Sequence, residues 1–324
     1  MATGGEHVSE QLEPTRGLQE ATLLSPRLMG IVMVLIGSTL WGISGTAAQK
    51  LFQHEGFSAG WLVDVRMGLS GIVLLLSVWV SQGPQKLWAI WKNGRDAVHL
   101  AGFAFFGLLG VQYSYLASIE HGNAAMATFL QYLGPAFLLI YVTLRARRLP
   151  TRIETAAVIF ALFGTLLLVT NGAWGKIVVP PSAVIWGIIS AVTLAIYTVS
   201  PFQLIRKYGS ATVVGWAMLI GTVFGSFITP PWHVAGSHFS ALSFILIGFV
   251  VVFGTLVAFY LYLASTNYIT PSETSLIACM EPLSAAVASV VWLHTRLGIA
   301  TIVGGLCILV TVVLLARKSG TPTT

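Results

Sequence analysis

The sequence predicts an all-α integral membrane protein with ten transmembrane helices, arranged as two inverted five-helix repeats. Three observations predict this fold class: the composition, the placement of charge between apolar runs, and an internal repeat. Of the 324 residues, 56% are hydrophobic and only 9% are charged, with a mean hydropathy of +0.83. A soluble chain carries about 25% charged residues. A membrane-spanning helix takes about 20 residues, so the chain has room for roughly ten.

Ten apolar runs, each bounded by charge, Gly or Pro, fit this number. A polar tail, 1–27, precedes them and lacks the apolar core and cleavage site of a signal peptide. We expect one repeat in 28–171 and the other in 182–316. A Pro-containing linker, 172–181, would join them, and 317–324 would form a C-terminal tail. The ten runs are 28–48, 61–81, 97–118, 124–144, 153–170, 182–201, 211–229, 242–264, 272–293 and 299–316.

Basic residues favour alternate loops between these runs. Ten spans place both chain ends on one side, and the positive-inside rule expects Lys and Arg on the cytoplasmic side. Thirteen of the 17 Lys and Arg lie on the side of the two tails, and Arg66 lies within a run. We therefore expect both termini in the cytoplasm. The remaining three basic residues, on the opposite side, are Lys50, Lys176 and Arg296.

The two halves repeat one another at an offset of 147 residues. Across positions 107–135, eight of 29 residues are identical to their counterparts, including the Tyr-x-Tyr-Leu-Ala-Ser segments 113–118 and 260–265. Duplicated halves are typical of membrane transporters. Because each half holds an odd number of spans, the second half would be inverted relative to the first.

Three motifs point to a known family. They are Leu40-Trp41-Gly42 in the first run, the Tyr-Leu-Ala-Ser segments, and the paired prolines Pro135 and Pro282. Together they resemble the EamA family of the drug/metabolite transporter superfamily, over both halves. The resemblance implies a carrier of the bacterial inner membrane that often exports amino acids or related small metabolites. Many members carry a Glu after the fourth and ninth spans. This chain reads Arg-Ala-Arg-Arg and His-Thr-Arg there, so no role of that Glu is carried over.

Pro135 and Pro282 lie about halfway along equivalent runs. Proline removes a backbone donor and clashes with the preceding turn, so it bends a helix and frees a carbonyl. Interrupted helices at matching positions are typical of a midplane binding site in transporters. We expect both prolines to border a substrate cavity. The alternative is that they only shape helix packing.

Glu281 and Arg66 are charged residues within apolar runs. Glu281 lies nine residues into its run, roughly 14 Å deep at 1.5 Å per residue. A carboxylate at that depth has a high free energy unless it is paired, protonated or in contact with water. We expect it to bind a substrate ammonium or to carry a proton, with a structural ion pair as the alternative. Arg66, about five residues inside its run, is expected to extend to the outer headgroups. Its alternative partners are a substrate carboxylate or Glu281.

Polar and aromatic side chains could orient a substrate in such a cavity. Thr128, Gln131 and Pro135 share one face of the fourth run by helical spacing, with Tyr132 beside them. Hydrogen bonding between helices is the alternative use of these groups. Aromatic belts at the membrane surface compete for the Trp and Tyr residues. The other candidates for substrate contact are Gln112, Tyr113, Tyr260, Trp41 and Tyr197.

An intramembrane enzyme is one competing function class. Gly42-Ile43-Ser44-Gly45 matches the nucleophile pattern of intramembrane serine proteases, but all seven His lie in the tail, loops or span ends. A non-transporting scaffold is the other class left open, and it would not need a midplane Glu beside duplicated prolines. A channel lacks its filter and charge series. Nucleic-acid binding is set aside because the basic residues are scattered.

The sequence therefore predicts a secondary transporter, and not an enzyme, that moves a small metabolite by alternating access, with export as the expected direction. No metal motif or nucleotide-binding loop occurs, so we expect no metal and no cofactor. Protons are the candidate coupling ion, and the lipid bilayer is the expected surrounding. Gly221-x-x-x-Gly225 permits close helix approach and leaves a homodimer open, although packing within the chain is the favoured use.

Overall fold

The computed structural model describes residues 25–173, 178–232, 234 and 236–319. Within these ranges every regular element is helical and no strand occurs, so the predicted all-α class is confirmed. Nine helices in the described ranges are long and apolar enough to cross a membrane. Most of the N-terminal tail, the linker around Lys176 and the last five residues lie outside the described residues.

The first half holds five apolar segments, and three of them are single helices. The third is assembled from α4, the π-helix η2 and α5, and the fourth from α6 and α7. The elements are α1 (Pro26–His54), α2 (Ala59–Gln82), α3 (Pro84–Trp88), η1 (Ala89–Lys92), α4 (Gly94–Gly102), η2 (Phe103–Leu109), α5 (Gly110–His121), α6 (Ala124–Gln131), α7 (Gly134–Arg145) and α8 (Arg152–Thr170).

The second half follows the same order. Its third segment again contains a π-helix, η3, and its fourth is again divided, into α14 and α15. The latter is apolar but has only 14 residues, so the count of ten spans remains a prediction. The elements are α9 (Pro181–Val199), α10 (Phe202–Tyr208), α11 (Ser210–Ile228), α12 (Ala241–Val251), η3 (Val252–Val257), α13 (Ala258–Ser265), α14 (Pro271–Ile277), α15 (Met280–Leu293) and α16 (Ile299–Ser319).

Local sequence signals set several helix ends. Thr151 and Glu154 form a capping box at the start of α8, and Thr270 and Glu273 form another at the start of α14. Each box satisfies backbone N–H groups that have no partner within the helix. Asn171 ends α8 in the left-handed conformation, with φ of 48°. Polar residues in otherwise apolar sequence therefore mark where these helices begin and end.

The two divided helices break next to the paired prolines. Tyr132 and Leu133 separate α6 from α7, and Pro135 lies in the first turn of α7. In the second half, residues 278 and 279 separate α14 from α15, whose first turn contains Pro282. The predicted stripe of Thr128, Gln131 and Pro135 is therefore divided between two helices, since α6 ends at Gln131 and Pro135 lies in α7.

The π-helical stretches η2 and η3 also lie at positions that the 147-residue offset brings together. Each contains a glycine of the repeat, Gly107 or Gly254. A Cβ at Gly254 would collide with the Ser44 side chain on α1, and one at Gly107 would lie 3.5 Å from the Tyr197 Cα on α9. Glycine is therefore required for the approach of η3 to α1, whereas the approach of η2 to α9 leaves room for a Cβ.

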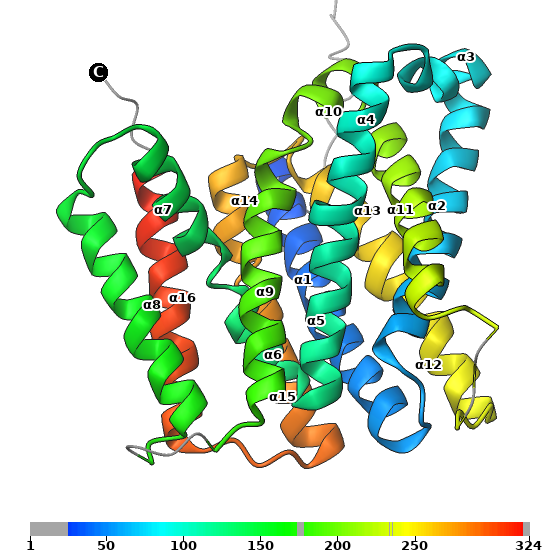
Figure 1. Cartoon of the computed structure of the whole chain (residues 1–324). Coiled ribbons are helices and arrows are strands. Elements are labelled where there is room, and N and C mark those ends of the chain that lie inside the picture. The colour runs from blue at the N-terminus through cyan, green and yellow to red at the C-terminus, as the bar shows by residue number, and fades with distance from the viewer. Residues whose placement is uncertain (1–24, 174–177, 233, 235, 320–324) are drawn as a thin grey trace, which may run out of the picture.

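Helices of the two halves pack against one another rather than forming separate bundles. In Figure 1, α7, α8 and α16 lie together at one side, and α1, α5, α6, α9 and α15 occupy the middle. The main pairings are α8 with α16, α2 with α11, α5 with α9, α1 with α13 and α15, and α6 with α9 and α15.

The motif Gly221-x-x-x-Gly225 is used within the chain. A Cβ at Gly221 would collide with the Met67 side chain, and one at Gly225 would collide with the Asp64 carboxylate. Both glycines therefore serve the close packing of α11 on α2.

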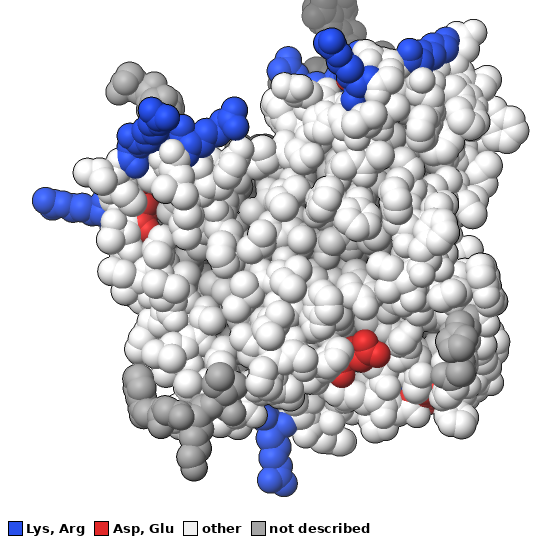
Figure 2. All heavy atoms as spheres, in the orientation of Figure 1, with Lys and Arg blue, Asp and Glu red and all other residues white. Residues whose placement is uncertain are grey.

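Charge is distributed unequally between the two ends of the bundle. On the face shown in Figure 2, Lys and Arg side chains gather at the end where the described chain finishes, and few lie at the opposite end. The broad surface between the ends is almost free of charge in this view, as a lipid-facing surface requires.

Candidate functional site

The two helix breaks meet through Tyr132. Its hydroxyl group lies 2.7 Å from the Ala278 carbonyl oxygen, in the break of the second half, and 3.2 Å from Glu281 Oε2. A carbonyl freed by a helix break must find a donor within a membrane protein. The Ala278 carbonyl has two donors, the Glu281 backbone N–H at 2.9 Å and the Tyr132 hydroxyl. The hydroxyl therefore joins the interrupted helices of the two halves where each is interrupted.

Glu281 lies in the first turn of α15 and is half-buried. The unpaired N–H groups at a helix start favour a negative charge there. The carboxylate is close enough to the phenol groups of Tyr115 and Tyr262 to interact with them electrostatically. Gly42 of α1 packs against the backbone of this turn so closely that a Cβ would collide with the Glu281 carbonyl oxygen. Among the phenol groups of Tyr115, Tyr132 and Tyr262, only the Tyr132 hydroxyl lies within hydrogen-bond distance of the carboxylate.

A second set of hydrogen bonds extends from this point toward α2. The Tyr115 and Thr128 hydroxyl groups lie 2.9 Å apart, and Thr128 also donates to the Ala124 carbonyl at 2.7 Å. Arg66 donates a hydrogen bond to Gln112 Oε1 and interacts electrostatically with Tyr115. These groups and those around Glu281 form what we call the central polar cluster: Arg66, Gln112, Tyr115, Thr128, Tyr132, Tyr262 and Glu281.

The expectation that Arg66 extends to the headgroups is wrong. Its side chain is buried, with the whole residue 6% exposed, because Gln112 on α5 accepts its hydrogen bond inside the bundle. Among the described side chains, the ion pairs do not include one between Arg66 and Glu281. The cluster therefore holds one guanidinium and one carboxylate that are not paired with each other.

The other predicted candidates lie around the cluster or away from it. Gln131, at the end of α6, donates to the Ser190 hydroxyl on α9 at 2.8 Å. Trp41 on α1 packs against Tyr262, with ring centroids 5.2 Å apart. Tyr197 stacks on Phe103, and Tyr113 packs edge-on against Trp186 beside a different cavity. Tyr260 is 69% exposed on the outside of α13, so it is not a part of the central polar cluster.

Sequence reasoning missed Tyr115 and Tyr262 as site residues. Both belong to the Tyr-x-Tyr-Leu-Ala-Ser repeat, so their equivalence was visible, but the repeat does not indicate which tyrosine of each pair faces inward. It also missed that Trp186-Gly187 repeats Trp41-Gly42. A Cβ at Gly187 would lie 2.8 Å from the Leu130 Cβ, so α9 approaches α6 as α1 approaches α15.

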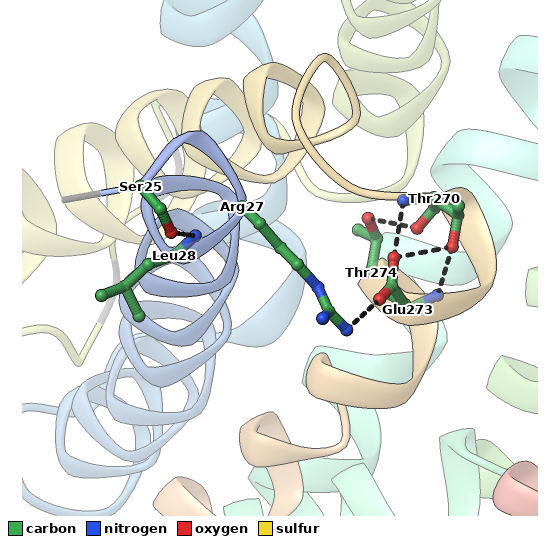
Figure 3. Close-up of polar contacts among 6 residues, drawn as sticks. All are labelled: Ser25, Arg27, Leu28, Thr270, Glu273 and Thr274. Atoms are coloured by element: carbon green, nitrogen blue, oxygen red, sulfur yellow. Dashed lines mark hydrogen bonds and ion pairs between the residues drawn. The ribbon is translucent and has the colours of Figure 1, made fainter.

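Polar contacts between the halves also occur at both ends of the bundle. At the basic end, Arg27 of α1 donates to Glu273 of α14 at 2.8 Å; Figure 3 shows it reaching across to the capping box. At the opposite end, the Ser240 hydroxyl donates to Glu55 Oε2 at 2.9 Å. Each contact joins α1 to an element of the second half.

A further pair at the basic end joins α10 to α4. Lys207 donates to Asp96 at 2.6 Å, and this hydrogen bond raises the pKa of the Lys207 ammonium. The Tyr208 hydroxyl lies 2.6 Å from the same oxygen atom. The carboxylate therefore anchors two adjacent side chains of the short helix between α9 and α11.

The described residues contain no group of three or more His, Cys, Asp or Glu that could hold a metal ion. Ser44, the centre of the protease-like motif, is buried and packs against Gly254. Its close contact is therefore with the backbone of η3.

The fold and the polar breaks define a class of membrane transporter, and comparison with known proteins identifies it. Residues 28–170 and 181–317 match the EamA-like transporter family, so the chain belongs to this family and the resemblance seen in the sequence is confirmed. It is a multi-pass membrane transporter.

Particular relatives are similar along most of their length. The uncharacterized inner membrane transporter YicL of Salmonella typhimurium is 35% identical over 292 residues, which cover 90% of this chain and 96% of that protein. An uncharacterized transporter of Archaeoglobus fulgidus is 26% identical over 225 residues, covering 69% of this chain and 78% of the relative. A crystal structure with 17% identity and a TM-score of 0.58, covering 91% of this chain and 99% of that chain, shares the fold.

Proposed function

We propose that the chain is a secondary transporter that moves a small metabolite, an amino acid or a related compound, out of the cell across the bacterial inner membrane by alternating access. The observation that carries this proposal is the central polar cluster at two matched helix breaks. Paired interruptions of this kind supply binding groups at the midplane while the rest of each helix stays apolar. Both termini lie in the cytoplasm in this proposal.

The proposed architecture is ten spans in two inverted repeats, 28–171 and 182–316. Three features support it: the breaks, the π-helices η2 and η3, and the helix pairing all occur in both halves. An exchange of the halves converts the pairing of α5 with α9 into that of α13 with α1. The pairs α8 with α16 and α2 with α11 are converted into themselves. A two-fold relation requires this pattern, and five spans in each half make it an inverted one.

The central polar cluster has the chemistry to bind a zwitterion. Glu281 would hold the substrate ammonium or exchange it for a proton, and Arg66 would face the substrate carboxylate. Gln131 and Tyr132 would orient the substrate, and Pro135 with its counterpart would allow the half-helices to tilt. An amino acid carries an ammonium and a carboxylate, and it requires one binding group of each opposite charge. Because Glu281 and Arg66 are not paired with each other, each could bind its group of the substrate.

Alternating access requires contacts at each end that open in turn. The pair Arg27 and Glu273 at the basic end, and Ser240 with Glu55 at the other, join α1 to the second half. An exposed ion pair contributes about 0–1 kcal/mol, and an ordinary hydrogen bond about 1 kcal/mol. Each end could therefore open at a small cost in free energy, which suits a gate.

The proposal is tested by Glu281→Gln in proteoliposomes, with substrates chosen from metabolites that cells secrete only when they contain the protein. We expect a transport rate at least about tenfold lower, equivalent to about 1.4 kcal/mol, and a loss of its pH dependence. Asp96→Asn, which removes a carboxylate outside the cluster, is the matched control. An unchanged rate and pH profile in Glu281→Gln would exclude the proton or ammonium role.

A further inference from the structure

A cavity separate from the central polar cluster lies between α2, η2, α5, α9 and α11. Its volume is about 200 Å³. An engineered protein cavity of about 150 Å³ holds benzene, so this one is large enough for a small organic molecule. Exposed residues such as Phe106 and Ile228 form part of its wall, so it opens to the outside of the bundle.

Asp64 lies in the wall of this cavity, with its carboxylate packed against Gly225 of α11. The residue is only 2% exposed, and neither carboxylate oxygen has a hydrogen-bond partner within 3.5 Å among the described residues. The Ser226 hydroxyl interacts with it, but donates its own hydrogen bond to the Thr222 carbonyl at 2.8 Å. A buried carboxylate without a partner carries a large desolvation cost, so the fold maintains Asp64 at the expense of its own stability.

The groups that face Asp64 do not include a cation. Arg66 lies two residues along the same helix, but it points to the opposite side and binds Gln112. From α5, Tyr113 lines the cavity, and Glu120 interacts electrostatically with that tyrosine. From α9 and α11 the cavity receives Thr193, glycine and aliphatic groups. The described surroundings are therefore neutral or acidic, and a positive charge would be favoured.

We propose that this cavity is a binding site for a small organic cation, an ammonium that carries an apolar or aromatic group. Asp64 would pair with the ammonium, and the rings of Phe105, Phe106 and Tyr113 would surround the apolar group. Aromatic faces attract cations, by up to about 2 kcal/mol when water is excluded. A metal ion such as Ca²⁺ prefers six to eight oxygen ligands, and a single carboxylate with a few hydroxyl groups does not provide them. The inference does not depend on the proposed transport function.

The test is a binding measurement on the purified full-length chain in detergent, with benzylammonium as the probe and benzyl alcohol as its neutral counterpart. We expect benzylammonium to bind at least about tenfold more tightly than the alcohol, equivalent to about 1.4 kcal/mol. Because protonation of Asp64 would compete with the cation, the affinity should fall as the pH is lowered. Equal binding of both compounds, or no binding of benzylammonium, would overturn the proposal.

Variants locate the site. We expect Asp64→Asn to lose at least about tenfold in benzylammonium affinity, Asp64→Glu to retain binding, and the control Asp96→Asn to match the unmodified chain. If Asp64→Asn does not fold, Ile228→Trp tests the same site, because a bulky ring at the rim narrows the cavity and leaves the carboxylate intact. Retained affinity in these variants, or its loss in Glu281→Gln alone, would assign the probe to another site and overturn the proposal.

Discussion

At the residue scale, the Tyr132 hydroxyl occupies a position that no other described side chain shares. It faces both the Ala278 carbonyl and the Glu281 carboxylate, and so joins the two interrupted helices. A single hydroxyl hydrogen serves both acceptors, so any movement of one half relative to the other changes how they share it. Tyr132 is therefore placed to respond to the charge of Glu281 and to the opening of the breaks together.

Tyr132→Phe tests this position. The substitution keeps the ring but removes the hydroxyl from the Glu281 carboxylate and from the Ala278 carbonyl, which keeps only the Glu281 backbone N–H. We therefore expect the protein to lose about 1–3 kcal/mol of stability and most of its transport rate. Thermal unfolding and proteoliposome transport measure the two effects. Tyr260→Phe is the matched control, because that side chain is exposed on the outside of α13 and should show neither effect. Equal behaviour of the two variants would contradict the role given to Tyr132.

Single residues also show where sequence reasoning succeeds and fails. Glu281 and Tyr132 could be chosen from the sequence because one is charged at mid-membrane depth and the other lies beside a repeated proline. The environment of Arg66 could not be predicted, because it depends on Gln112, a residue 46 positions away on another helix. Asp64 was passed over for the same reason: the cavity that it lines is made by five elements, and none of them reveals it alone.

At the element scale, α1 packs on α15 through a contact that only glycine permits. A Cβ at Gly42 would collide with the Ser284 hydroxyl and would lie 2.7 Å from the Ala285 backbone nitrogen. The obstacle is partly backbone, so α1 would have to move away from α15 and disturb the first turn that holds Glu281. The contact thus couples the position of α1 to the central polar cluster.

Gly42→Ala is expected to lower the stability by about 1–3 kcal/mol, the usual range for overpacking, and to reduce transport. Gly248→Ala, in α12, is the control, since a Cβ there meets nothing within 4 Å and alanine favours a helix. Thermal unfolding of both purified variants measures the difference. A Gly42→Ala protein as stable as the control would show that α1 and α15 can separate freely.

At this scale the sequence predicted which segments form helices, but it did not predict whether a helix is continuous. Long apolar runs define the segments because the bilayer demands about 20 apolar residues of each. The prolines indicated the places of the breaks, but a stripe from Thr128 to Pro135 assumed one continuous helix. Whether a proline bends a helix or interrupts it depends on the donors that reach the freed carbonyl, here the Glu281 backbone N–H and the Tyr132 hydroxyl for the Ala278 carbonyl.

At the scale of the whole molecule, the unequal charge of the two ends predicts the orientation in the membrane. A cysteine in place of Arg296, in a chain that lacks Cys279 and Cys307, should react with a membrane-impermeant thiol reagent in intact cells. A cysteine in place of Lys86, at the opposite end, should react only after permeabilisation. Gel-shift of the labelled protein measures both. The reverse pattern, or equal labelling at the two positions, would contradict the ten-span topology.

Helices of the first half pack against helices of the second half, and this pairing affects how the protein folds during synthesis. Helix α1 packs against α13 and α15, whose residues follow it by more than 200 positions. During synthesis it must therefore remain in the membrane without these two neighbours until the chain is almost finished, although α5 and α6 are made earlier. Ser38, Ser44 and Thr46 lie on faces of α1 that are buried in the finished fold. Long-range pairing of this kind slows folding and exposes intermediates. Biogenesis should thus be most vulnerable to truncation before α15 emerges.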